Sequence, residues 1–466
     1  MTRNVRGDVL ASALLLAACG ETNHPLGTDP VDAVDARAPS PADAVEPFGT
    51  VTVRVIGEHG APLEHVPVAF YNASRALEAV ELTDVHGIAR HDVHPGAIIT
   101  AGYQTRVSRG SLVTYFGVDP GEEITVGDLW GDAPPIAAST DRITLNLPAS
   151  PFAQTSWTVS PGGPNTVSGV KQTYDAQRET LLELGGNAVR PLIAYLWSRS
   201  SGETLAWSYA EGSVAGTPQV SFPSWRVEFS NFLVDVHNSL PQNVSTGWSQ
   251  LWPVIGDRAY AISRDATYAS PRAGETVRME PRYPDGAADL VAYSVQLAFH
   301  GWSGHGTRLS VEGIGQVPLA PLKLDLADDL PPVMDGCSLV FDAGEATPRF
   351  VRSSPIDSER ADLGAQLAYF PDGGAFKTWV IFFPPDAPTL LSPPSLPDEL
   401  AQLAPSPGTP HTYVHQLWAN DVAIGGPAGT RAARADAWGH FWREVRHDAG
   451  PRQPHEIRRS LCWSTP

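Results

Sequence analysis

Apolar and polar residues alternate in short segments from residue 50 onward. Over residues 51–55, valine alternates with threonine and arginine, a period of two that is typical of a β-strand with one buried face. Similar short patterns predict further strands at 66–70, 88–90, from residue 98, and at 112–116, 124–126 and 143–147. Short strands at this spacing predict a β-sandwich over residues 49–148.

Turn residues separate these strands. Asp84-Val85-His86-Gly87 predicts a tight turn, because glycine supplies backbone freedom and an aspartate side chain can accept hydrogen bonds from its own turn. Pro67 lacks an amide hydrogen and therefore indicates the end of a strand or an edge strand.

Two segments of this region carry a family resemblance. GTVTVRVIGEHGAPLEHVPVAFYN (49–72) and TDVHGIARHDVHPG (83–96) resemble the carboxypeptidase regulatory-like domain, which is similar to transthyretin and bacterial Ig-like domains. The resemblance implies a Greek-key β-sandwich over 49–148 that has no catalytic residues of its own and serves as a spacer or binding module in cell-surface proteins. Residues 149–466 carry no such resemblance.

The alternation continues beyond residue 149. Strands are predicted at 188–198 and 204–209, with a hairpin at Ser200-Ser201-Gly202, and two strands are predicted within 218–236. Residues 291–299 alternate so regularly that a strand with one buried and one solvated face is predicted there. Further strands are expected at 377–383 and 413–418. The chain is therefore predicted to be all-β, with a larger β-sandwich-type domain, or two, over 149–466.

Three segments depart from the strand pattern. Residues 384–410 are rich in proline and are predicted to form a long loop. Trp438, Phe441, Trp442 and Val445 fall at helical spacing and predict one helix. Residues 327–332 are interpreted as a solvated linker at a sub-boundary of the larger region. The aspartates there, Asp325, Asp328 and Asp329, could bind calcium, but their spacing does not match a calcium-binding loop.

Composition limits the classes of function. The chain has 466 residues, enough for two or three domains, and its net charge of −19 argues against nucleic acid as a partner. The same charge argues against binding anionic lipid through the protein surface. No segment reaches the length of apolar sequence that a transmembrane helix needs.

The first residues resemble a bacterial lipoprotein signal. Arg3 and Arg6 precede a short apolar segment, and Leu16-Ala17-Ala18-Cys19 fill the four positions of the lipobox. The resemblance implies that residues 1–18 are removed and that Cys19 is acylated, which would anchor the protein through lipid chains. In such lipoproteins an aspartate directly after the cysteine favours retention on the inner membrane. Gly20 stands at that position here, so the resemblance implies the outer membrane. The alternative is an ordinary secretory signal cut after Ala17 or Ala18.

Residues 19–48 are predicted to be a disordered tether. They are rich in proline, alanine and acidic residues and hold few large apolar side chains, so they cannot bury enough surface to offset the entropy of ordering. Prolines and like charges extend such a segment, which would hold the folded body away from the membrane.

Cys337 and Cys462 are left after Cys19 is assigned to the anchor. An even pair in an exported protein predicts a disulfide between them, and the alternative is two buried free thiols.

Catalytic motifs are weak. Gly301-Trp302-Ser303-Gly304-His305 approaches the nucleophile-elbow pattern, but His305 stands where its final glycine belongs and no helical pattern follows. Ser303 could be combined with Asp362 or Asp372 and with His411 or His415 into a triad, as any long chain allows. A loop after the 291–299 strand is the simpler interpretation.

Histidines and tryptophans offer the remaining candidates. His86, His91 and His94 lie around one turn and could converge on a metal, but solvated surface histidines explain them as well, and no metal or other cofactor is predicted. Twelve of the 13 tryptophans follow residue 149. Most are expected in the core, although three exposed aromatic residues on one face would favour a glycan or protein ligand.

These observations predict a lipid-anchored cell-envelope protein that is a non-enzymatic binding or structural component. An envelope hydrolase with the first sandwich as an accessory domain is the alternative, and a purely structural spacer is a third interpretation.

Overall fold

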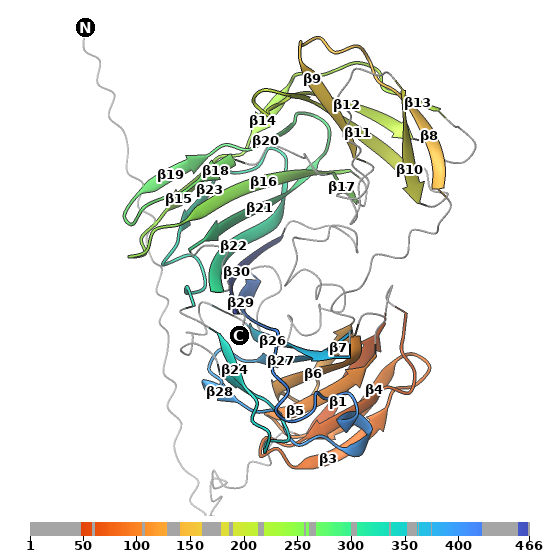
Figure 1. Ribbon diagram of the computed structural model, residues 1–466, viewed down its shortest axis with the longest axis vertical. Coiled ribbons are helices and arrows are strands. Elements are labelled where there is room, and N and C mark those ends of the chain that lie inside the picture. The colour runs from red at the N-terminus through yellow and green to blue at the C-terminus, as the bar shows by residue number, and fades with distance from the viewer. Residues whose placement is uncertain are drawn as a thin grey trace, which may run out of the picture. The chain divides into compact units, whose positions relative to one another are not determined.

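The computed structural model describes residues 48–57, 61–104, 108–127, 140–160, 179–185, 190–212, 219–255, 258–260, 267–299, 305–334, 337–351, 361, 363–373, 375–421 and 455–464 (Figure 1). Within these ranges the chain forms 30 β-strands and one helix of four residues, so it is an all-β protein, as the alternating pattern predicts. No helix within the same ranges is long and apolar enough to span a membrane.

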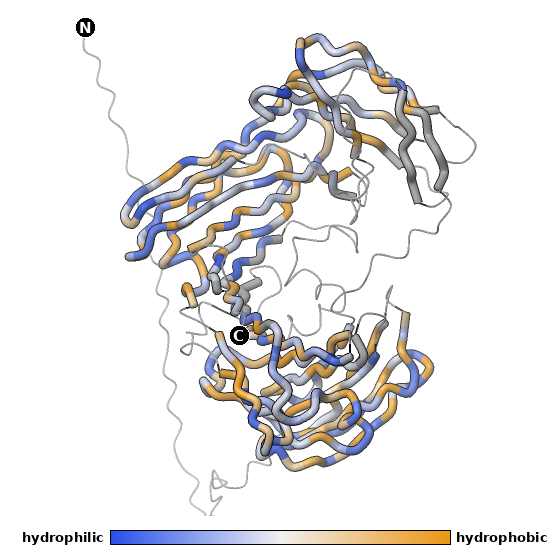
Figure 2. Tube along the Cα trace, viewed as in Figure 1, coloured by the Kyte–Doolittle hydropathy of each residue, from blue (hydrophilic) through white to orange (hydrophobic). Residues whose placement is uncertain are grey.

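The first strand forms where its pattern predicts. β1 (Gly49–Ile56) buries its three valines completely and leaves Arg54 exposed. It pairs antiparallel with β4 (Ile88–Val93) and parallel with β7 (Glu123–Gly127). Burying each valine stabilises the fold by about 1.5–3 kcal/mol. Figure 2 shows apolar and polar residues in turn along many strands.

A second sheet holds thirteen strands, in the order β17-β16-β21-β22-β30-β29-β26-β27-β6-β5-β2-β3, with β18 paired to β16. Their bounds are β2 (Pro67–Tyr71), β3 (Leu77–Leu82), β5 (Ala97–Tyr103), β6 (Ser108–Val118), β16 (Thr246–Ile255), β17 (Arg258–Ala259), β18 (Thr267–Ala269), β21 (Leu290–Ala298), β22 (His305–Gln316), β26 (Leu363–Asp372), β27 (Ala375–Phe383), β29 (Tyr413–Asp421) and β30 (His455–Ser464). β27 pairs in parallel with β6, so a strand from late in the chain extends the first sandwich.

Part of this sheet is covered on both faces. Val113 and Val380 point into the core shared with β1, β4 and β7, whereas Leu112 and Trp379 point into a second core on the opposite face. The second core includes residues of β24 (Ser338–Val340), β25 (Arg349–Val351), β28 (Leu390–Leu391) and the helix α1 (Asp398–Ala401). A Cβ at Gly110 would lie 2.5 Å from the Leu403 carbonyl oxygen, so glycine there permits the close approach.

Smaller sheets build the remaining cores. β10-β8-β13 and β12-β11-β9 enclose one core, and β19-β15-β23 and β14-β20 contribute to another that covers β16, β21 and β22. The strand bounds are β8 (Thr140–Asn146), β9 (Thr155–Ser160), β10 (Glu179–Gly185), β11 (Arg190–Ser198), β12 (Thr204–Gly212), β13 (Gln219–Ser221), β14 (Phe229–Asn231), β15 (Val234–His237), β19 (Thr276–Met279), β20 (Arg282–Pro284) and β23 (Leu322–Asp325).

Two predicted turns have the expected chemistry. The Asp84 carboxylate accepts hydrogen bonds from the amides of His86 and Ile88, at 2.8 and 3.0 Å, and these bonds lower the pKa of Asp84. Gly87 adopts φ +72°. β11 and β12 pair as the predicted hairpin, and Pro67 begins β2.

Three sequence predictions were wrong in detail. β21 buries both faces rather than one, because side chains cover its polar face as well. Residues 218–236 form three short strands rather than two. The proline-rich segment 384–410 is not only loop, since it holds β28 and α1. The helix predicted around Trp438 lies outside the described residues.

The segment after β23 is packed and is not a solvated linker. Leu326 and Leu330 are buried in the core with β15 and β21, because the apolar side chains of this segment point inward while its aspartates form a turn.

Candidate functional site

A row of buried polar side chains crosses one face of the large sheet. Ser294 and Gln296 of β21 are each 1% exposed, Ser310 and Glu312 of β22 are 6% and 3% exposed, and Arg459 of β30 is 5% exposed. Ser294 lies opposite Glu312, and Ser310 lies opposite both Gln296 and Arg459, so the five side chains share a face. We call this set the polar row.

The polar row contains a buried ion pair. Arg459 Nη2 contacts Glu312 Oε1 across the pairing of β22 with β30. Burying a single charge is costly, and losing one partner of a buried pair leaves the other uncompensated. The pair therefore holds β30 against β22 in one register.

Arg308 extends the row through amide hydrogen bonds. Its Nη1 donates to Gln296 Oε1 at 2.9 Å, and Gln296 Nε2 donates to Ser294 Oγ at 3.0 Å. These contacts link β22 to β21, on the side away from β30. The polar row thus connects three neighbouring strands.

His415 of β29 lies near this group. It pairs with Trp463 of β30 and with Leu367 of β26, and its ring packs edge-on against Tyr369 at 6.0 Å between centroids. Burial, and then the positive charge of Arg308, lower the pKa of His415 to about 4. The imidazole is neutral at physiological pH.

The lowered pKa of His415 predicts a loss of stability in acid. Because the unfolded chain binds the proton near pH 6.5 and the folded protein near pH 4, the free energy of unfolding falls as the pH drops between these values, by about 3 kcal/mol in all. Chemical denaturation from pH 7.5 to 4 should show a steeper loss for the parent protein than for His415→Gln. Parallel pH profiles for the two proteins would contradict this assignment.

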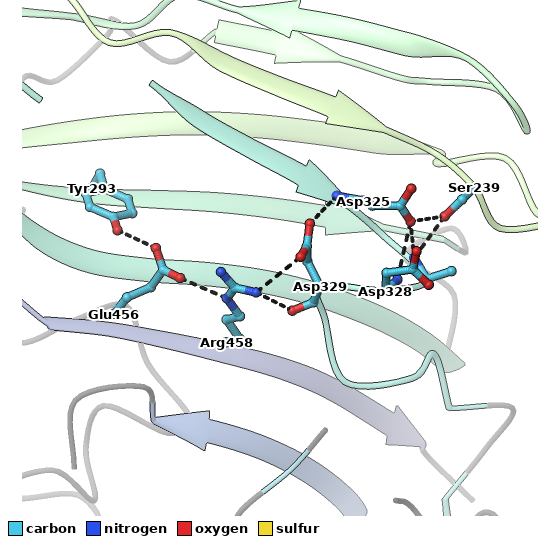
Figure 3. A network of polar contacts seen from close by, with 8 residues as sticks. Ser239, Tyr293, Asp325, Asp328, Asp329, Glu456 and Arg458 are labelled. Carbon is cyan, nitrogen blue, oxygen red and sulfur yellow. Dashed lines mark hydrogen bonds and ion pairs between the residues drawn. The ribbon is translucent and has the colours of Figure 1, made fainter. Parts of the chain in front are cut away.

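Figure 3 shows a second polar network. It lies on the opposite face, because Tyr293 directly precedes Ser294 in β21 and successive residues of a strand point to opposite faces. Tyr293 donates to Glu456 Oε2 at 2.7 Å, and Arg458 Nε donates to Glu456 Oε1 at 2.8 Å. Arg458 Nη1 also donates to the Asp329 carbonyl at 2.8 Å. Burial and the charge of Glu456 raise the pKa of Tyr293, so its hydroxyl stays protonated and acts as a donor. The network fastens β30 to the loop after β23.

The carboxylates of Asp325 and Asp329 in that loop accept hydrogen bonds from Ser239 and from the backbone of the loop itself. Asp325 accepts hydrogen bonds from Ser239 Oγ and from the amides of Ala327 and Asp328, and the bond from Ser239 is the main cause of its lowered pKa. Asp329 accepts from the Asp325 amide at 2.7 Å. This arrangement is a hydrogen-bonded turn, and among the described residues no group of three potential ligands could hold a metal ion.

Two members of the predicted triad, Asp372 and His415, are not brought together. Leu367 pairs with His415, and Asp372 follows five residues further along β26, which is about 17 Å at the rise of a strand. Asp372 is therefore beyond hydrogen-bond reach of His415. His305 begins β22 opposite Ser464. Ser303, Asp362 and Cys19 lie outside the described residues.

The three histidines around the first turn have separate neighbours. His91 packs against Phe70 and lies 3.9 Å from a Glu81 oxygen, and the His94 ring lies 4.8 Å from that of Phe48. His86 is exposed at the Asp84 turn. Each position is explained by packing or by exposure to solvent.

The described tryptophans are mostly core residues, as expected. Five are buried, and three more are half-buried. None of these eight forms an exposed stacking platform. The five are Trp157, Trp197, Trp207, Trp252 and Trp379, and the three are Trp225, Trp248 and Trp463.

Sequence reasoning missed the residues that the two networks use. Arg308, Ser310 and Glu312 occupy alternate positions and could have been assigned to one face from their spacing. The sequence carries no local signal for their burial. It also carries none for their partner Arg459, which lies on a strand almost 150 residues later in the chain.

The comparisons with known proteins find only weak likenesses. No protein-family model and no curated protein sequence matches the chain. Similar solved structures include the TIE protein of Bacillus anthracis (8% identity, TM-score 0.14, 60% of this chain and 49% of that one). Another is the major pilin subunit BcpA of Bacillus cereus, with 8% identity and a TM-score of 0.15 over 60% of this chain and 98% of that one. A third is the pilus adhesin SpaC of Lactobacillus rhamnosus GG in its open conformation, with 10% identity and a TM-score of 0.14 over 73% of this chain and 44% of that one. The chain spans about half the length of the TIE protein, and likeness at these TM-scores assigns it to no family.

Proposed function

We propose that this chain is a lipoprotein of the bacterial cell envelope, anchored through acyl chains on Cys19, whose β-rich body is a non-enzymatic binding or structural component. The observation that carries the proposal is Leu16-Ala17-Ala18-Cys19 after a positively charged start and a short apolar segment. Acyl chains on one cysteine would hold the protein on a membrane without an inserted helix.

The polar chemistry of the body supports a structural or binding role. The polar row and the Figure 3 network join strands to one another and to a loop. Their hydrogen bonds and ion pairs connect side chains of this protein to other residues of the same protein, which is a structural use of polar groups. The resemblance of residues 49–148 to carboxypeptidase regulatory-like domains supports a spacer or a binding module for a protein or glycan partner. Gly20 supports the outer membrane as the site of anchoring.

The anchor is tested by Cys19→Ser in the native cell. Because serine cannot receive the thioether-linked lipid, we expect the variant to leave the membrane pellet and the detergent phase, whereas the parent protein stays in both. Mass spectrometry of the N-terminal peptide of the parent should show an acylated cysteine.

Gly20→Ala is the matched control, since it alters the neighbouring residue and keeps the thiol, and it should sediment with membrane. A Cys19→Ser variant that sediments as the parent does, or an unmodified amine at the mature N-terminus of the parent, rejects the anchor. Covalent labelling of Ser303 by a fluorophosphonate probe would favour the hydrolase instead.

A further inference from the structure

Cys337 and Cys462 meet in the core on one face of the large sheet. Their sulfur atoms lie 2.6 Å apart, and both side chains are buried. Cys462 belongs to β30, and Cys337 immediately precedes β24, so the pair connects the large sheet to the layer that covers it. The residues are 125 positions apart in the chain.

We propose that Cys337 and Cys462 form a disulfide bond that fixes β30 between β22 and β29. Each thiol gives up a proton, and the pair transfers two electrons to the disulfide of a thiol oxidoreductase, which is reduced to a dithiol as the new sulfur–sulfur bond forms. The inference concerns the body of the protein and does not depend on the lipid anchor.

Other contacts hold the two cysteines in place. Ser464 Oγ donates to the Cys337 carbonyl at 2.9 Å, and the Cys337 thiol lies 3.8 Å from the carbonyl of Val414 on β29. Thr307 of β22 donates to the Met334 carbonyl at 2.8 Å, three residues before Cys337. Three strands therefore position the segment that carries Cys337, and the sulfur atoms meet without help from a bond.

The surroundings also set when the bond forms. The contact with Cys337, and then burial, raise the pKa of the Cys462 thiol, so it holds little of the thiolate that thiol–disulfide exchange requires. Because both side chains are buried in the folded protein, an oxidoreductase reaches the sulfur atoms more easily before β30 is fully packed. Once formed, the disulfide is shielded from reductants by the same packing.

Peptide mapping tests the bond directly. Full-length protein from an oxidising compartment is denatured, alkylated without reduction and digested with trypsin. We expect the peptide of residues 324–349 to be linked to that of residues 460–466, with a mass two hydrogen atoms below the sum of the reduced peptides. Recovery of both cysteines alkylated, or of either one linked to Cys19, overturns the proposal. Cys19→Ser should leave the linked peptide unchanged.

A second measurement tests the locking role. Reductant present during unfolding should lower the Tm of the parent protein by about 5 °C or more, because the bond closes a long loop. The Cys337→Ala/Cys462→Ala variant should have the same Tm with and without reductant. An equal Tm for the parent in both conditions rejects a stabilising lock even where the linked peptide is found.

Discussion

Ser460→Pro is expected to destabilise the protein by on the order of 4 kcal/mol or more, because proline removes a ladder hydrogen bond and clashes within a central strand. Ser460 is fully buried in the middle of β30, opposite Leu309 of β22 and Trp418 of β29. Within the described strands, β22 and β29 belong to one sheet only through β30. The free energy of unfolding from denaturant titration measures the loss, and hydrogen exchange should show faster amide exchange in both neighbouring strands.

Ser460→Ala is the matched control, because it keeps the backbone amide. The Ser460 hydroxyl has no hydrogen-bond partner among the described residues, so its removal should be neutral or slightly stabilising. A proline variant as stable as the alanine variant would show that β30 is not a central strand.

Arg459→Met is expected to cost about 3–5 kcal/mol, because it leaves the Glu312 carboxylate buried without its cationic partner. Methionine fills much of the arginine's volume, so the loss reflects charge rather than a cavity. Denaturant titration at neutral pH gives the magnitude. The fold should survive at reduced stability, which near-ultraviolet circular dichroism can confirm before the titration.

The double variant Glu312→Met/Arg459→Met tests whether the stability lost in Arg459→Met comes from the unpaired Glu312 carboxylate. Removing both charges together should recover most of the stability lost in the single variant, since no uncompensated charge remains. If the double variant loses as much stability as the single variants Arg459→Met and Glu312→Met lose together, the two side chains do not interact as an ion pair.

Local patterns predict about half of the strands, because alternation is a property of adjacent residues, and they miss long strands such as β16, β22 and β30. The valines of β1, the Asp84 turn and the β11–β12 hairpin all lie where the pattern places them. The same reasoning failed for β21. Its alternating polar residues predict a solvated face, whereas Ser294 and Gln296 are buried, because alternation shows which residues share a face and does not show what covers that face.

The sequence by itself indicated the all-β class, about half of the strand positions, and the lipobox-like segment and cysteine pair that motivate the two proposals. Only the tertiary structure decided that β27 lies beside β6, that Arg459 pairs with Glu312 and that Cys462 reaches Cys337. The physical reason is the distance along the chain over which each kind of interaction acts. Strand propensity and turn chemistry act over a few residues, whereas strand order and burial depend on contacts between segments that are distant in the chain, for which a single sequence carries no local signal.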